Sequence, residues 1–296
     1  MLLSRYFLKW FFFTLLVVMF GSAFLLIELS LISFQPIMIA FYRVTIAAFI
    51  LYIYSYYKNY SFNFFKDNFK LLFILGLTGT SLPFYLISWA QVTITSSETG
   101  ILIGFMPLFT IIGSHYYFKY EILNFSKIFG FIIGFFGLLI LAFHNESDLA
   151  IYGNLLAKFA VILGAFFYAL NALLVKKIKD VNIIPLSASV MFLSSLQLLI
   201  CILLFDNNGF ISQKFEFIPV ISLLFMGIFS TAIATVIYYK IIHDYGPSFS
   251  SLVNYPIPIF SVFLGVVFLN ENLSIYSILS LCLVMLAIYI SQRELS

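Results

Sequence analysis

Charged residues are scarce in this chain of 296 residues. Lys, Arg, Asp and Glu together make up 9% of it, whereas an ordinary soluble domain has about a quarter. Apolar residues reach 63%, and the mean hydropathy is +1.10. A water-soluble fold of this size could not bury so much apolar surface. We therefore expect an all-α integral membrane protein whose solvent is the lipid bilayer.

Cysteine and histidine are also rare, with two and three residues. Cys201 and Cys282 lie in long apolar runs, which favours buried thiols over a disulfide or a metal site. No metal-ligand spacing, nucleophile–base pair or phosphate-binding glycine loop is present in the sequence. The net charge is only +3, and no basic, aromatic-rich segment favours nucleic acid. We expect no metal, no cofactor, no nucleic-acid partner and no enzyme activity.

Long apolar runs divide the chain into ten candidate membrane spans, since about 20 apolar residues cross a bilayer core. The run that follows Arg5 and Lys9 is long for a signal peptide and has no clean cleavage site after it, so we interpret it as a retained first span. The predicted spans are residues 10–28, 36–56, 70–90, 98–117, 126–143, 153–175, 185–205, 217–239, 248–268 and 274–291.

The basic residues provide an independent test of this topology. With ten spans and a cytoplasmic N-terminus, the Lys and Arg residues outside the spans fall on the cytoplasmic side, except Lys214. The positive-inside rule describes this asymmetry. We therefore expect a multi-pass protein of the cell inner (plasma) membrane with both termini in the cytoplasm.

The two halves of the chain share chemically special residues at a fixed offset. Each half would hold five spans, an odd number, so equivalent helices would cross the membrane in opposite directions. Inverted five-helix repeats, at residues 1–147 and 148–296, are a common basis for alternating access in transporters. The pairs are Gly76 and Gly227, Thr80 and Thr231, and Pro107 and Pro258, each 151 apart, and Glu121 and Glu271, which are 150 apart.

Several segments resemble the drug/metabolite transporter superfamily, in its ten-helix EamA-type branch. Arg43, seven residues after Pro36, also matches a position where that family often has an arginine, but no basic residue stands near Ser194, its counterpart in the second half. The resemblance implies a transporter of small metabolites, commonly an exporter. The segments that carry it are Met226-Gly227-Ile228-Phe229-Ser230-Thr231-Ala232, Tyr245-Gly246-Pro247, Tyr255-Pro256-Ile257-Pro258, Phe268-Leu269-Asn270-Glu271, Leu75-Gly76, Ala90, Met106-Pro107-Leu108-Phe109 and Glu121.

Arg43 is the strongest single candidate for a substrate contact. An arginine inside a span costs roughly 2.5–3.5 kcal/mol on insertion scales and must face a partner or a water-filled cavity. It either attracts an anionic or zwitterionic substrate group or forms a structural ion pair with Glu28. Glu28 is itself one of the expected substrate-pathway residues, and proton coupling through Glu28 or Glu98 is a further alternative. Two other charges have simpler explanations: Lys158 snorkels to the outer interface, and Glu98 sits at a helix N-terminus.

Prolines and polar aromatic residues suggest where a cavity lies. Pro83, Pro107, Pro256 and Pro258 fall within the third, fourth and ninth spans, where each removes a backbone donor and distorts its helix; simple bending for packing is the alternative. The residues that we expect to line the cavity are Tyr85, Trp89, Tyr168, Asn171, Asn254 and Tyr255, although a deep asparagine also commonly bonds a neighbouring helix.

These features predict a secondary transporter that moves a small organic metabolite, such as an amino acid or a nucleoside-like compound, by alternating access. Export or exchange is the expected direction. Multidrug efflux of lipophilic cations and lipid flipping remain alternatives. The Gly-x-x-x-Gly segments at 100–104 and 130–134 permit close helix contacts, within a monomer or between the subunits of a homodimer.

The inverted topology can be tested by labelling. Single cysteines placed beside Glu121 and beside Glu271 should react with a membrane-impermeant thiol reagent from opposite sides, because the two hairpins would lie across the bilayer from each other. Labelling of intact cells and of inverted vesicles measures this. Reaction of both positions from the same side would end the inverted-repeat interpretation.

Overall fold

The computed structural model describes residues 2–118, 125–143, 151–178, 181–205 and 215–292, and these residues form helices without strands. The α-helices are α1 (Leu2–Leu31), α2 (Pro36–Tyr57), α3 (Phe64–Asp67), α4 (Phe69–Gly76), α5 (Leu82–Ala90), α6 (Ser96–Ile103), α7 (Met106–Phe118), α8 (Phe125–Phe143), α9 (Ile151–Val175), α10 (Ile183–Phe205), α11 (Phe217–Phe225), α12 (Ala234–Tyr245), α13 (Pro247–Ser251), α14 (Pro256–Leu269) and α15 (Ile275–Gln292). Two π-helical segments, η1 (Leu77–Ser81) and η2 (Met226–Ile233), and a 3₁₀ turn, η3 (Leu252–Asn254), complete the set.

Eight helical segments in the described part of the chain are long and apolar enough to cross a membrane. This confirms the predicted all-helical membrane protein. Two shorter apolar helices, Phe125–Leu141 and Ile275–Ala287, overlap the fifth and tenth predicted spans. The eight longer segments are Trp10–Leu31, Pro36–Tyr57, Phe69–Ala90, Ser96–Tyr116, Asn154–Val175, Ile183–Phe205, Phe217–Tyr245 and Leu252–Leu269.

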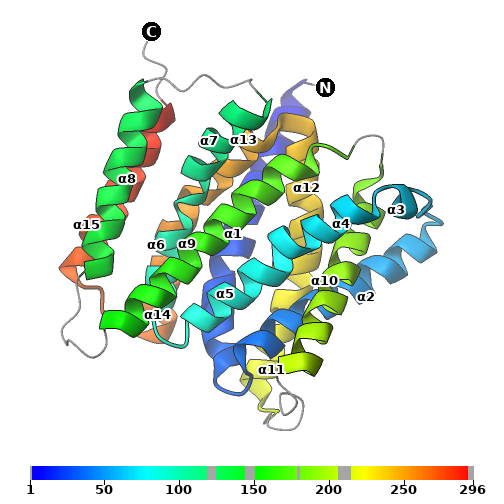
Figure 1. The fold of residues 1–296 in the computed structure, drawn as a ribbon, viewed down its shortest axis with the longest axis horizontal. Helices are drawn as coiled ribbons and strands as arrows, with labels where there is room; N and C mark the ends of the chain where they lie inside the picture. Colours follow the sequence, from blue (N-terminus) through cyan, green and yellow to red (C-terminus); the bar gives the residue numbers. More distant parts are fainter. Residues whose placement is uncertain (1, 119–124, 144–150, 179–180, 206–214, 293–296) are drawn as a thin grey trace.

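The helices form one bundle, in which α8 and α15 pack on each other at one edge (Figure 1). The first turns of α1 and the last turns of α15 lie at the same end of the bundle, which we call the termini end. The opposite end, the α1–α2 end, carries the connection at residues 32–35 and the start of α6. Elements from the two halves of the chain interleave, because α2 packs on α10, α5 on α9 and α6 on α14.

Four of the long segments change helix type along their length. Pro83 follows η1 directly, Pro107 follows a break at residues 104–105 between α6 and α7, and Pro256 follows η3. These are the third, fourth and ninth predicted spans. The eighth span is interrupted as well, by η2, and its proline, Pro219, lies in the first turn of α11, well before η2. The position of a proline therefore does not mark this interruption.

The two π-helical segments occupy corresponding places in the two halves. Residues 77–81 of η1, shifted by the repeat offset, fall within η2. Close packing surrounds both, because a Cβ at Gly76 would come within 2.8 Å of the Ser194 Oγ and one at Gly227 within 2.8 Å of Ile46. The π-helix is a rare form that often marks functional sites.

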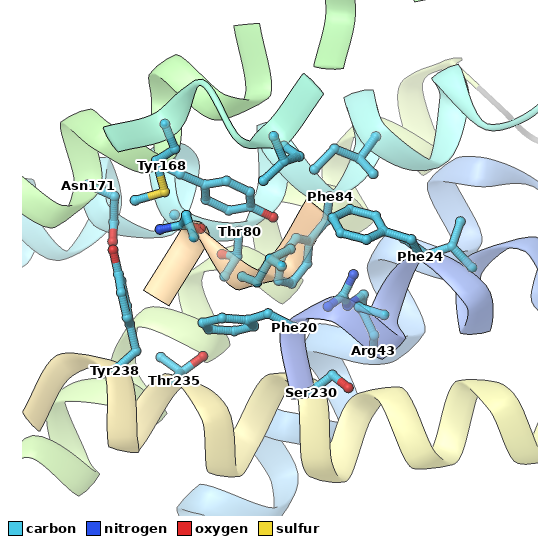
Figure 2. A pocket seen from close by; sticks show the side chains of 18 of the residues that line it. Phe20, Phe24, Arg43, Thr80, Phe84, Tyr168, Asn171, Ser230, Thr235 and Tyr238 are labelled. Carbon is cyan, nitrogen blue, oxygen red and sulfur yellow. The ribbon is translucent and has the colours of Figure 1, made fainter. Parts of the chain in front are cut away.

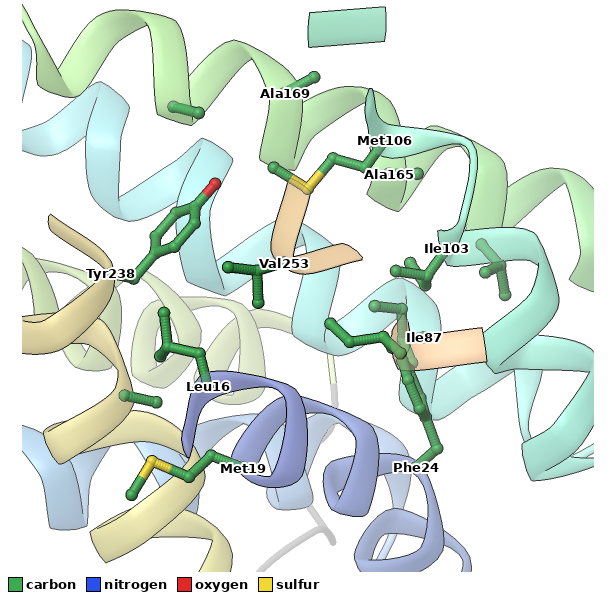
Figure 3. Close-up of a cluster of buried hydrophobic side chains, with 14 of the residues drawn as sticks. Leu16, Met19, Phe24, Ile87, Ile103, Met106, Ala165, Ala169, Tyr238 and Val253 are labelled. Carbon is green, nitrogen blue, oxygen red and sulfur yellow. The ribbon is translucent and has the colours of Figure 1, made fainter. Parts of the chain in front are cut away.

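Buried apolar side chains from both halves fill the centre of the bundle (Figure 3). Leu16 and Phe24 of α1, Ile103 of α6, Ala165 of α9 and Val253 of η3 belong to one cluster. Large apolar side chains also cover the outer surface, as expected for a protein solvated by lipid.

The two cysteines lie on that outer surface. Both Cys201 and Cys282 are exposed, free thiols, so the expectation of buried thiols is wrong. An apolar run in a membrane helix has one face toward the protein and one toward lipid, and the run alone does not say which face a residue takes.

Gly100 allows α6 to lie against α14, since a Cβ at this position would overlap the Ser261 side chain. We expect Gly100→Ala to destabilise the protein by about 1–3 kcal/mol through overpacking. Thermal unfolding in detergent measures this. Gly164→Ala on α9 is the matched control, because its Cβ would meet Ile87 at an ordinary 3.5 Å. Equal stability of the two variants would contradict the close α6–α14 contact.

Candidate functional site

A cavity of about 80 Å³ lies among the central helices, enclosed by residues from both halves of the chain. It borders α1, α2, η1, α5, α6, α7, α9, η2, α12, η3 and α14. Most of its wall is aromatic or aliphatic, and the polar groups come from a few side chains. Its lining is Phe20, Ala23, Phe24, Ile27, Arg43, Gly79, Thr80, Phe84, Ile87, Ile103, Met106, Tyr168, Asn171, Ser230, Thr235, Tyr238, Tyr239, Asn254 and Ile257.

Arg43 is the charged residue of this lining, and its side chain is 3% exposed. Its Nε donates a hydrogen bond of 3.1 Å to the Thr231 Oγ1. Its Cζ lies 3.5 Å from the centroid of the Phe84 ring, a cation–π contact. Figure 2 shows the guanidinium below Phe84 and between Phe20 and Phe24. Two neighbours therefore fix the orientation of the group.

The Arg43 guanidinium has no carboxylate partner among the residues that the structure describes. Glu28, the predicted partner, instead accepts a hydrogen bond of 3.3 Å from the Gln91 Nε2, and Gln91 also donates to the Phe24 carbonyl at 2.9 Å. The hydrogen bonds of Glu28 thus link α1 to the end of α5 rather than to α2. A buried cation without a counter-ion has to be offset by dipoles, ring faces or a bound anion.

Thr231 connects Arg43 to the π-helical segment η2. Its hydroxyl donates to the Met226 carbonyl at 2.9 Å while it accepts from Arg43. The counterpart threonine, Thr80 in η1, donates to the Gly76 carbonyl at 2.8 Å and shares a hydrogen bond of 2.5 Å with Ser194. Since 43 and 194 differ by the same 151 as 80 and 231, the two contacts are equivalent by position. One is charged and the other is neutral.

Two more of the predicted cavity residues, Tyr168 and Asn171 on α9, lie in the wall of this cavity. Tyr168 packs edge-on against Phe84, with ring centroids 6.3 Å apart. The Asn171 Nδ2 donates to the Leu75 carbonyl at 2.9 Å, just before η1. Asn171 therefore has an inter-helix role as well as a place in the wall, so both interpretations of a deep asparagine apply.

Of the other residues predicted to line the cavity, one does so and three do not. Asn254 lines the cavity from η3. Tyr85 and Tyr255 are partly buried and pack against neighbouring apolar clusters rather than the cavity. Trp89 is 39% exposed on the outer surface. Tyr85 and Trp89 share one helix face, and the face of α5 that carries Phe84 and Ile87 is the one that turns inward.

Sequence reasoning missed several lining residues. Phe20 and Phe24 are one helical turn apart on α1, and Ser230, Thr235 and Tyr238 come from η2 and α12. Because the chain has 38 Phe and 19 Tyr, the sequence does not indicate which aromatic residues line the cavity. The one usable signal was the repeated threonine, which marks η1 and η2.

A second polar cluster lies at the α1–α2 end, where Glu271 accepts hydrogen bonds from the start of α6. The Ser96 backbone N and Oγ donate to its Oε1 at 2.9 and 2.8 Å. The Ser97 backbone N donates to its Oε2 at 3.1 Å, and the Ser97 hydroxyl bonds the same oxygen. A carboxylate at a helix N-terminus is favourable, so Glu271 joins the end of α14 to α6. Glu121 lies outside the described residues.

Lys158 belongs to the same end of the bundle and is 1% exposed. Its Nζ lies 3.4 Å from the Glu98 Oε1 and donates to the Leu141 carbonyl at 2.5 Å. The prediction that Lys158 snorkels to the interface is therefore wrong. A partly exposed carboxylate and a carbonyl, both contributed by other helices, hold the ammonium inside the protein. This ion pair could not be predicted from sequence spacing, because Glu98 and Lys158 lie on different spans.

The family comparison decides the class of protein. The model of the EamA-like transporter family matches residues 8–143 and again residues 155–292. This chain belongs to the EamA-like transporter family. The expected resemblance to the drug/metabolite transporters is thereby confirmed, and the protein is a membrane transporter.

Relatives with known sequences agree with this assignment. An uncharacterized transporter of Archaeoglobus fulgidus is 29% identical over 290 residues, which cover 97% of this chain and 99% of the relative. The uncharacterized transporter YoaV of Bacillus subtilis is 23% identical over 275 residues, 92% of each chain. A solved crystal structure superimposes with a TM-score of 0.71 over 95% of this chain and 96% of its own, at 14% identity. That last likeness shows the fold alone.

The buried ion pair yields a stability prediction. Lys158→Met leaves the Glu98 carboxylate and the Leu141 carbonyl without their donor, and we expect a loss of about 1–3 kcal/mol. Adding Glu98→Gln removes the unpaired charge and should recover part of that loss. Thermal unfolding in detergent measures both variants. A single variant as stable as the starting protein would mean that the lysine contributes nothing in the interior.

Proposed function

We propose that this protein is a secondary transporter that moves a small organic metabolite with an anionic or zwitterionic group by alternating access. Ten membrane helices would form two five-helix halves, residues 1–147 and 148–296, in opposite orientations. The double match of the family model, at 8–143 and 155–292, supports the duplication. The location of the first turns of α1 and the last turns of α15 at one end of the bundle is consistent with an even number of spans.

The observation that carries this proposal is Arg43, a buried cation that faces the cavity without a carboxylate partner in the described structure. In a low-dielectric interior an unpaired guanidinium is costly. A substrate anion would supply the missing counter-charge when it binds. Tyr168, Asn171 and Asn254 would offer hydroxyl and amide groups to the remaining polar atoms of the substrate.

The residues that line the cavity argue against the efflux of lipophilic cations. The cavity residues in the described chain include no Asp or Glu. The two carboxylates that could have served a cation are engaged elsewhere, Glu28 with Gln91 and Glu98 with Lys158. An arginine at the cavity would repel a cationic drug, and no contact in the structure favours a lipid substrate.

The proposed mechanism assigns the two ends of the bundle to the two sides of the membrane. The termini end would face the cytoplasm of a cell with this protein in its inner (plasma) membrane, and the α1–α2 end would face outside. The contact of Glu271 with Ser96 and Ser97 would then hold the outer ends of α14 and α6 together. Opening the cavity to the outside would require these hydrogen bonds to separate.

Arg43→Ala should cut transport by roughly tenfold or more, because the loss of a charge-assisted contact typically costs about 1.5–3 kcal/mol. The cargo is found first by comparing metabolites inside and outside cells with and without the protein. Flux of that cargo is then measured in proteoliposomes that contain no nucleotide. Tyr85→Phe, away from the cavity, is the control variant. Strict dependence on ATP would overturn secondary transport, and full flux in Arg43→Ala would make the arginine structural.

A further inference from the structure

The charge balance of the cavity narrows the substrate class. Arg43 is the charged residue among those that line it, so the cavity carries one positive charge. A bound anion with a single negative charge would bring the total to zero. A zwitterion would leave its ammonium without a carboxylate, and a dianion such as a phosphate monoester would leave one negative charge unpaired. Unpaired charges in a low-dielectric interior are strongly disfavoured.

The orientation of the guanidinium narrows the class further. Nε is occupied by the Thr231 hydroxyl at 3.1 Å, and one face of the group lies on the Phe84 ring at 3.5 Å. The two Nη groups form no hydrogen bond with the described residues. Two adjacent N–H groups on a planar guanidinium match the two oxygens of one carboxylate in a bidentate pair.

The remainder of the wall indicates what the carboxylate is attached to. Phe84 lies against the guanidinium, Phe20 and Phe24 line the same cavity (Figure 2), and Ile87 and Ile103 extend the apolar wall. The Ser230 and Tyr238 hydroxyls, also in the lining, are buried without a hydrogen-bond partner among the described residues, so two neutral polar contacts are still open. An apolar body with a few neutral hydroxyl or carbonyl groups fits such a wall.

We propose that the cavity binds organic monocarboxylates with an apolar body and no ammonium group. This inference rests on the proposed transport function and assigns its substrate class. Thr231 acts as a positioning residue, because its hydroxyl holds Nε and thereby directs both Nη groups at the carboxylate. The same hydroxyl is held in turn by the Met226 carbonyl of η2, so the π-helical segment sets the position of the anion site.

Four probes that share one ring test the class: hydrocinnamate, which is phenylalanine without its ammonium group; phenylalanine; phenyl phosphate; and hydrocinnamyl alcohol. Binding is measured with the purified protein at neutral pH by thermal stabilisation and by isothermal calorimetry. We expect hydrocinnamate to bind at least about tenfold more tightly than the other three. Equal or tighter binding of phenylalanine or phenyl phosphate, or no binding of hydrocinnamate, would overturn the monocarboxylate class.

Variants of Arg43 and Thr231 test whether the Thr231 hydroxyl positions the guanidinium. Arg43→Gln and Thr231→Val should each weaken hydrocinnamate binding, by about tenfold or more for the arginine and by a smaller factor for the threonine, whereas Thr231→Ser should restore it. Thr45→Val is the matched control, since the Thr45 hydroxyl also bonds a carbonyl of its own helix, that of Phe41, and a side chain of another helix, Ser195, but does not line the cavity. An equal loss in Thr45→Val and Thr231→Val would refute the positioning role, and so would failure of the serine variant to rescue.

The proposed transport function and the proposed monocarboxylate class can be refuted separately. Gradient-driven flux of phenylalanine without flux of hydrocinnamate would preserve the transport function and eliminate the monocarboxylate class. Hydrocinnamate binding that depends on Arg43, with no gradient-driven flux of any cargo, would preserve the site and eliminate the proposed transport mechanism. Proteoliposome flux and equilibrium binding on the same protein preparation distinguish these outcomes.

Discussion

The buried guanidinium of Arg43 is the constraint on which the packing of the central helices depends. Three features of its surroundings stabilise the charge of Arg43 there. Its Nε donates a hydrogen bond to the Thr231 hydroxyl, its guanidinium lies on the electron-rich face of the Phe84 ring, and the rest of the group faces the cavity. Each of these neighbours comes from a different helix. The need to solvate one cation therefore ties α2, α5 and η2 together around a space that an anion can enter.

Irregular backbone makes that arrangement possible. A regular α-helix bonds each interior carbonyl to an N–H four residues on, whereas the π-helical segments η1 and η2 bond carbonyls to N–H groups five residues on. In η2 the Thr231 hydroxyl also donates across five residues, to the Met226 carbonyl. In lipid such irregular backbone is tolerated only where protein or a cavity satisfies it. Both π-helical segments border the cavity, through Gly79 and Thr80 in one and Ser230 in the other, as this rule requires.

The membrane helices could be predicted from the sequence, because hydropathy and length are summed over many residues. The direction of a single side chain is decided locally and was harder to predict. Trp89 faces outward and Lys158 inward, both against expectation, since an apolar run does not reveal its buried face. Arg43 was found because an arginine in a span has few acceptable environments. Of the two alternatives for Arg43, the ion pair with Glu28 does not form in the described structure, and the partner that does bond it, Thr231, is distant in sequence.

The same offset that relates the two halves also shows where they differ in charge. Thr80 and Thr231 occupy equivalent places and both stabilise a π-helical turn, but one bonds Ser194 and the other Arg43. The pair with serine is neutral and fully hydrogen-bonded within the protein, so it has no need of a ligand. The pair with arginine leaves donors facing the cavity. Duplication therefore accounts for the shared helix geometry, and a single unmatched residue, Arg43, accounts for the positive charge on which the proposed substrate binding rests.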